Sequence, residues 1–176
     1  MKNFSSIFVL ALISTILFSC AKDSTSKPTG SYYLEAKIDG NSKQFNSTLF
    51  AMKMNFGVGY YALNINGMSS TGSEQLSLNL FSDKDDFIAG KVYTKDALGG
   101  TTYNSLAYLS PTGIPDPSAS WESVYIYGNE PESFTCTITE ATSTYIKGTF
   151  SAVLYQNVAT VAKKTVTEGK FYAKFN

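Results

Sequence analysis

Apolar and more polar side chains alternate with a period of two through most of the chain after residue 31, and this restricts what the chain can fold into. In the first run, Leu34, Ala36 and Ile38 alternate with Glu35 and Lys37 before Asp39-Gly40 provides a turn. Alternating side chains lie on opposite faces of a β-strand, so these runs predict strands with one buried face. The clearest further runs cover 61–66, 76–80, 134–138, 149–154 and 170–175, and weaker ones cover 45–54, 90–93, 105–109 and 121–128.

The part of the chain beyond the N-terminal apolar run has no long segment with the 3.6-residue stripe of an amphipathic helix. Many short strands separated by turn residues are typical of antiparallel all-β domains. The sequence therefore predicts an antiparallel β-sandwich of roughly 8–10 strands, with a lipocalin-like β-barrel as the alternative.

The N-terminus has the layout of a secretory signal. Lys2 is followed by an apolar run from Ile7 to Phe18, and the small residue Ser19 then precedes Cys20. The run is shorter than the roughly 20 residues that cross a bilayer as a helix. We expect a lipoprotein signal peptide over 1–19; an ordinary signal cleaved elsewhere, or a short membrane helix, is the alternative.

The end of this segment, Leu17-Phe18-Ser19-Cys20, resembles a bacterial lipobox. In such signals the cysteine thiol is the nucleophile that accepts a diacylglyceryl group, and cleavage leaves the cysteine as the first residue. Several acyl chains, at about 0.8 kcal/mol per buried methylene, anchor a protein firmly. The resemblance implies that Cys20 is the lipid attachment site and that the membrane is a partner through this anchor.

A polar segment rich in Ser, Thr, Pro and Gly follows the cysteine, so 20–31 is expected to be a flexible tether. At about 3.3 Å per residue it reaches roughly 35 Å. Residues 32–176 then have the size of a single all-β domain.

Ala21 is not the aspartate that marks inner-membrane retention in some bacteria, and Lys22-Asp23 resembles a surface-export tag. We expect lipid anchoring in the outer membrane, on the periplasmic face or at the cell surface.

Several residue types that carry chemistry are missing from the chain. It has no histidine, which removes the usual zinc ligand and general base, and all 14 basic residues are lysines. With 14 acidic residues the formal charge is balanced, so nucleic acid is not an expected partner. Cys136 shares its strand face with Phe134 and Ile138 and is expected to be a buried, inert thiol. We expect no enzyme activity, no cofactor and no metal site.

Two sets of acidic residues are candidate sites. Glycoside hydrolysis needs two carboxylates across a cleft, and the available glutamates, which we expect to be solvated loop acids, are Glu122, Glu130, Glu132 and Glu140. The run from Asp83 to Asp86 has the oxygen ligands that calcium prefers, but it lacks EF-hand spacing and includes Lys84. We expect it to be a charged hairpin tip.

One aromatic row is the candidate binding surface. In WESVYIYG, Trp121, Tyr125 and Tyr127 fall on one face of a strand, and Val124 and Ile126 fall on the other. If Val124 and Ile126 face the core, the three rings stand outward as a platform for sugar rings or partner side chains. The alternative is that the aromatic face is the core.

The two ends of the domain, LEAKIDGNSKQF and YIKGTFSAVLY with VTEGKFYAKF, resemble a family of uncharacterised Bacteroidota lipoproteins. That family has an F-x-A-x-x-D-G opening strand and a G-T-F...T-x-G-x-F closing hairpin, matched here by Leu34, Ala36, Asp39-Gly40, Phe45, Ile146, Gly148-Thr149-Phe150, Val166-Thr167 and Gly169-Lys170-Phe171. The resemblance implies an all-β lipoprotein domain and no particular activity.

Together these features predict a non-catalytic binding or interaction domain whose ligand is a glycan or a protein. The alternatives are a small glycan-processing hydrolase and a carrier of an apolar small molecule. A hydrolase would need two acids converging in a cleft, and a carrier would need a lined internal cavity.

Overall fold

The structure is a computed structural model that describes residues 31–97, 102–111, 120–123, 134–156 and 162–176. These residues form β-strands and connecting segments and contain no helix. The described part of the chain therefore has no helix that could cross a membrane. The strands are β1 (Tyr33–Ile38), β2 (Asn41–Gln44), β3 (Ser47–Asn55), β4 (Tyr61–Met68), β5 (Gln75–Ser82), β6 (Val92–Thr94), β7 (Asp96–Ala97), β8 (Thr102–Tyr103), β9 (Ser105–Leu109), β10 (Ser120–Glu122), β11 (Phe134–Ala141), β12 (Tyr145–Gln156) and β13 (Lys163–Lys174).

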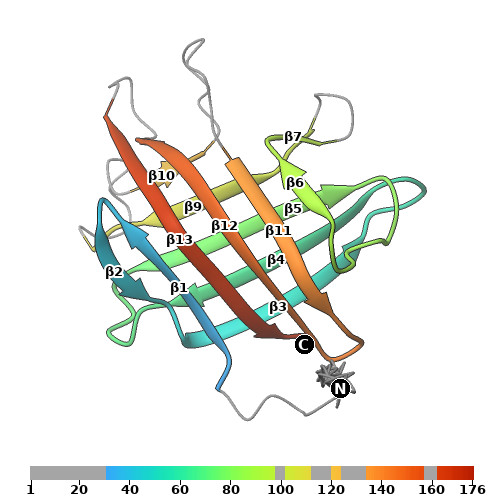
Figure 1. Ribbon diagram of the computed structural model, residues 1–176, viewed down its shortest axis with the longest axis horizontal. Coiled ribbons are helices and arrows are strands. Elements are labelled where there is room, and N and C mark those ends of the chain that lie inside the picture. Colours follow the sequence, from blue (N-terminus) through green and yellow to red (C-terminus); the bar gives the residue numbers. More distant parts are fainter. Residues whose placement is uncertain (1–30, 98–101, 112–119, 124–133, 157–161) are drawn as a thin grey trace, which may run out of the picture. The chain divides into compact units, whose positions relative to one another are not determined.

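Eleven of these strands belong to one sheet, in the order β2-β1-β13-β12-β10-β9-β5-β4-β3, with β11 and β6 branching from β12. The sheet is antiparallel throughout its ladders and curls into two facing layers (Figure 1). The front layer contains β2, β1, β13, β12, β11 and β6, and the back layer contains β10, β9, β5, β4 and β3, whose strands cross behind the front ones (Figure 1). The predicted all-β class is confirmed.

The long strand β12 is where the sheet divides into the two layers. Its first part pairs with β11, and its last two residues, Tyr155 and Gln156, pair with β10 instead. Its other edge pairs with β13 over almost its whole length. At the opposite side, a parallel bridge joins Ala51 of β3 to Phe175 beyond β13. The layers are therefore parts of one half-closed sheet, which shares features of the predicted sandwich and of the alternative barrel.

The first strand shows how the alternation places side chains. Leu34, Ala36 and Ile38 are buried, as predicted. Asp39 and Gly40 both have positive φ, +50° and +79°, which fits the two-residue turn that joins β1 to β2. The carboxylate of Asp39 accepts the Thr165 N–H at 2.8 Å and so holds this turn against β13.

The β12–β13 pairing sets each of two glycines opposite a phenylalanine. Gly148 faces Phe171 and Phe150 faces Gly169, and the two rings are stacked with centroids 6.4 Å apart. A Cβ on Gly169 would lie 2.5 Å from ring atoms of Phe150, so each ring occupies the space that a glycine leaves. The repeated G-x-F pattern in the sequence is therefore a packing device.

The core lies between the layers and contains the alternating apolar residues of both. Cys136 is buried, as predicted, and burial raises the pKa of its thiol to about 12. The structure has more strands than the roughly 8–10 that the alternation predicts, because the short strands β2, β7 and β8 lie outside the predicted runs, whereas β6 and β10 overlap the weaker runs 90–93 and 121–128. Strands as short as β2, β7 and β8 carry no visible alternation.

Candidate functional site

The structure corrects the outward placement of Trp121. Its side chain is 9% exposed and belongs to the core, on the same face of β10 as the fully buried Ser123. The ammonium of Lys164 lies 4.4 Å from the centre of the indole ring. Tyr125 and Tyr127, the other two members of the predicted aromatic row, lie outside the described residues.

The acidic candidates are spread apart in the described residues. Glu140 of β11 lies opposite Lys147 of β12, whereas Glu122 of β10 lies opposite Tyr155, eight positions further along β12. Eight residues of strand span about 26 Å, too far for two carboxylates to act on one glycosidic bond. Glu130 and Glu132 lie outside the described residues.

In the Asp83–Asp86 run, Asp86 forms an ion pair with Lys91 and Asp85 forms one with Lys53. In the described part of the chain, no three side chains that could bind a metal ion lie together.

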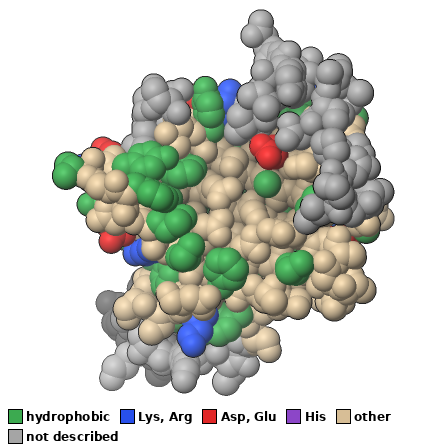
Figure 2. Space-filling model, turned by 180° about the vertical axis from the view of Figure 1, so that it is seen from behind, with side chains coloured by type: hydrophobic (Ala, Val, Ile, Leu, Met, Phe, Trp, Pro, Cys, Tyr) green, Lys and Arg blue, Asp and Glu red, His purple; other side chains and the backbone are tan. Residues whose placement is uncertain are grey.

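The outer face of β3, β4, β5 and β9 in the back layer is unusual because it carries no charged side chain; Glu122 of β10, which pairs with Ala107, borders it. Across β3, β4, β5 and β9, the residues that pair on this face are Phe50, Met52, Met54, Ala62, Asn64, Asn66, Met68, Gln75, Ser77, Asn79, Phe81, Ser105, Ala107 and Leu109. We call this set the uncharged face. Figure 2 shows hydrophobic side chains along one side of this layer and, over its middle, mostly backbone and side chains that are neither hydrophobic nor charged. The outer face of the front layer differs, because Lys147, Lys170 and Glu140 project from it.

Amide and hydroxyl side chains cross the middle of the uncharged face as hydrogen-bonded rows. The Nδ2 of Asn64 donates to Oδ1 of Asn79 at 2.7 Å, and Nδ2 of Asn79 donates to Ser105 at 3.3 Å. In the next row, Asn66 donates to Ser77 at 2.5 Å. A carboxamide has two N–H donors and an oxygen with two lone pairs, so these amides keep unused donors and acceptors facing solvent. The rows hold them in a fixed orientation.

An apolar stripe follows β3 and ends in three aromatic rings. Phe56 and Tyr60, which flank the β3–β4 turn, have ring centroids 5.3 Å apart, and Tyr60 and Phe81 of β5 are nearly parallel with centroids 5.8 Å apart. Phe56 is 59% exposed and Met52 is 39% exposed. We call Phe56, Tyr60 and Phe81 the aromatic stack. Its rings offer flat apolar surface next to the oriented amides.

A hollow of about 680 Å³ opens beside the aromatic stack. Phe81 and Gly59 of the β3–β4 turn line it, and so do Val92 and Thr94 of β6, a strand of the front layer. Asp96 also lines the hollow. Its size is in the range of small-molecule sites, and it shares Phe81 with the uncharged face.

The charged groups in and around the hollow differ in whether they have a partner of opposite charge. The Lys91 ammonium donates a hydrogen bond to the Asp86 carboxylate and another, at 3.0 Å, to Ser82 Oγ. Burial raises the pKa of Asp86, but the hydrogen bonds from Lys91 and Ser82 outweigh it, and the net effect is a pKa below the usual range. Burial, followed by the charge of Asp86, raises the pKa of Tyr93 far above its ordinary value. Asp86 is therefore ionised and Tyr93 neutral at pH 7.

Two carboxylates of the hollow have no such partner. Asp83 and Asp96 are exposed, and neither forms an ion pair within the described residues. Among the described residues that line the hollow, the single lysine is already paired with Asp86, so Asp83 and Asp96 leave this lining with a net negative charge.

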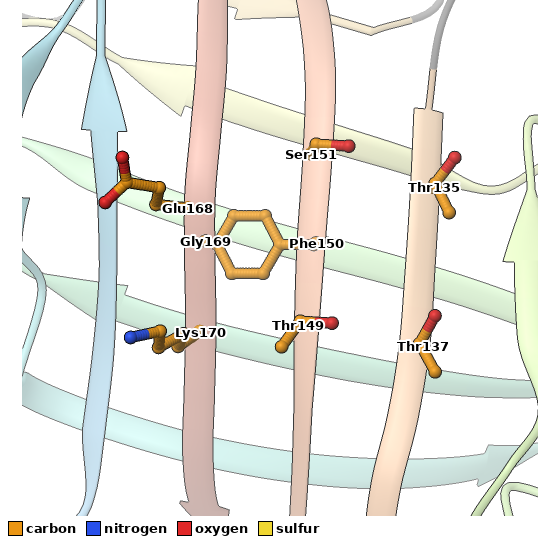
Figure 3. A pocket seen from close by; sticks show the side chains of 8 residues that line it. All are labelled: Thr135, Thr137, Thr149, Phe150, Ser151, Glu168, Gly169 and Lys170. Carbon is orange, nitrogen blue, oxygen red and sulfur yellow. The ribbon is translucent and has the colours of Figure 1, made fainter.

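A second, smaller depression of about 240 Å³ lies on the outer face of the front layer (Figure 3). The hydroxyls of Thr149 and Ser151 point toward Thr135 and Thr137 of β11, with which they pair across the strands (Figure 3). The charged ends of Glu168 and Lys170 point the other way, and Phe150, the one aromatic residue among the described residues of the lining, is buried. This depression offers hydroxyl groups but no exposed ring surface.

The sequence contained the signal for the uncharged face, but alternation alone did not reveal it. The polar partners of the buried residues in β4 and β5 are asparagine and serine, while those in β1 are glutamate and lysine. That difference separates the two outer faces only after the strand order is known. Comparison with known proteins found no matching family model, no matching curated protein and no matching solved structure.

Proposed function

We propose that this protein is a lipid-anchored envelope lipoprotein of the outer membrane or cell surface, and that its uncharged face binds a neutral polysaccharide without catalysis. The observation that carries the binding proposal is the aromatic stack of Phe56, Tyr60 and Phe81 beside the Asn64–Asn79–Ser105 row. The anchor is inferred from the lipobox at Cys20.

The chemistry of the face favours a neutral sugar chain over other ligands. Sugar rings have apolar C–H faces, which pack on aromatic rings, and hydroxyl edges, which exchange hydrogen bonds with amides. A face without charge has no group to pair with phosphate, sulfate or carboxylate. Oriented amides also spare the ligand the cost of ordering them on binding.

Replacing Cys20 with alanine is expected to abolish lipid attachment, because the methyl side chain has no nucleophile to accept the diacylglyceryl group. The measurement is incorporation of a labelled fatty acid, with electrophoretic size as a second readout. A Cys136→Ala variant is the matched control and should be labelled like the unaltered protein, since Cys136 is buried. Labelling of the Cys20→Ala protein at mature size would contradict the anchor.

Replacing Phe56 and Tyr60 together with alanine is expected to weaken polysaccharide binding at least about tenfold, which corresponds to about 1.4 kcal/mol. The reason is that two ring faces of the aromatic stack are lost. The measurement is affinity electrophoresis or calorimetry of the full-length protein in detergent against starch, mannan, xylan and a mixed-linkage glucan, with polygalacturonate as an anionic comparison.

The matched control is Tyr32→Ala, which removes a tyrosine that is 38% exposed and contacts Tyr172 of the front layer. It should leave binding unchanged. The proposal fails if the unaltered protein binds none of the neutral polysaccharides, or if the Phe56→Ala, Tyr60→Ala protein binds them as well as the unaltered protein does.

A further inference from the structure

We propose that the hollow beside Phe81 is a subsite for the terminal unit of the polysaccharide, with Asp83 and Asp96 accepting hydrogen bonds from its hydroxyl groups. This inference rests on the proposed function, because the rest of the chain would lie on the uncharged face. It adds that the protein recognises chain ends, and that the end unit is neutral.

The first argument is continuity between the two surfaces. Phe81 pairs with Ala62 on the uncharged face and also lines the hollow, and Gly59 lies in the turn that carries the other two rings of the aromatic stack. A glycan that packs on the aromatic stack therefore reaches the hollow without crossing a gap.

The second argument is that the uncharged face does not continue across the hollow. Residues of β6 also line it, and β6 pairs with β11 and so belongs to the front layer rather than to the uncharged face. A chain that runs along the uncharged face into the hollow would therefore reach Val92 and Thr94, which are not part of that face. The volume of about 680 Å³ accommodates a small molecule, and the described residues of β6 that line it do not belong to the uncharged face.

The third argument is the chemistry of the lining. An ionised carboxylate is an acceptor only, and its hydrogen bonds are about twice as strong as those between neutral groups. Asp83 and Asp96 are exposed and form no ion pair among the described residues, so both can accept from hydroxyls. The same two charges repel a sugar acid. Asn104 is already used, because its amide donates to Thr94 O and accepts from Phe81 N–H, so it shapes the wall.

The experiment is NMR titration of the full-length protein in detergent with the methyl glycosides of glucose, galactose and mannose, and with methyl glucuronide. At least one neutral glycoside is expected to shift the amide signals of Val92, Thr94 and Asp96 while those of Asn64 and Asn66 stay in place. Methyl glucuronide should shift none of them.

The test variant is Asp83→Asn with Asp96→Asn, which keeps side-chain size at two exposed positions and removes both charges. Its affinity for the neutral glycoside is expected to fall about tenfold, which is about 1.4 kcal/mol. The matched control is Asp85→Asn, since Asp85 contacts Lys53 at 3.4 Å and does not line the hollow. It should bind like the unaltered protein.

The two proposals fail separately. If polysaccharide binds and depends on Phe56 and Tyr60, but no neutral glycoside shifts the signals of the hollow, the end-binding inference is wrong and the uncharged face stands. An unchanged affinity in the double aspartate variant, or equal binding of methyl glucuronide, also overturns it. If neither polysaccharide nor glycoside binds, both proposals are wrong.

Discussion

Replacing Phe171 with alanine is expected to lower the free energy of unfolding by about 3 to 5 kcal/mol. The ring is 0% exposed, stacks on Phe150 and fills the space opposite Gly148. The alanine variant would leave a cavity in the middle of the front layer that the β12–β13 ladder cannot close. Urea unfolding followed by circular dichroism measures the loss.

A double-mutant cycle with Gly148→Ala tests the reason for this loss. A methyl group on Gly148 would overlap the ring of Phe171 and the carbonyl oxygen of Thr137, so Gly148→Ala alone should destabilise strongly. Combined with Phe171→Ala, the loss should be smaller than the sum by about 0.5 to 3 kcal/mol, because one clash is relieved. The control is Thr149→Ala, at the exposed position next to Gly148. Its free energy of unfolding should stay within about 0.5 kcal/mol of that of the unaltered protein. Simple additivity would contradict the packing of ring against glycine.

Truncating Trp121 to alanine is expected to lower the free energy of unfolding by about 3 to 5 kcal/mol and to leave polysaccharide binding in place. The indole is 9% exposed within the core, beneath the ammonium of Lys164. Trp121 is the only tryptophan, so its fluorescence reports this site alone. The emission should be blue-shifted and protected from acrylamide in the folded protein.

Trp121→Phe separates packing from hydrogen bonding at this position. The indole Nε1 is buried and has no hydrogen-bond partner among the described residues, so phenylalanine gives up no bond to them and keeps most of the ring. Its loss of stability should be clearly smaller than that of Trp121→Ala. A Trp121→Ala protein that unfolds at nearly the same urea concentration as the unaltered one, but binds polysaccharide poorly, would instead place the indole in the binding surface.

The strands and their buried faces were determined by the sequence itself, because the alternation that specifies them is local. Leu34, Ala36 and Ile38 are buried, and so are Leu76, Leu78 and Leu80, as the period of two requires. Where both faces of a strand carry apolar residues, the period does not decide which face is buried. In β10 the choice also depended on Ser123, whose hydroxyl accepts the Leu106 N–H at 2.9 Å and so places a polar residue inside.

Only the tertiary structure decided which solvent-facing residues became neighbours. Asn64, Asn79 and Ser105 are far apart in the sequence and form one row because β4, β5 and β9 lie side by side in register. The hollow depends on a longer-range event, since β6 follows β5 in the chain but joins the front layer through β11. Strand order and the curl of the sheet arise from contacts between distant segments, which no local pattern encodes. The sequence alone thus determined that the outward residues of β4 and β5 are uncharged, and the fold brought them together as a surface.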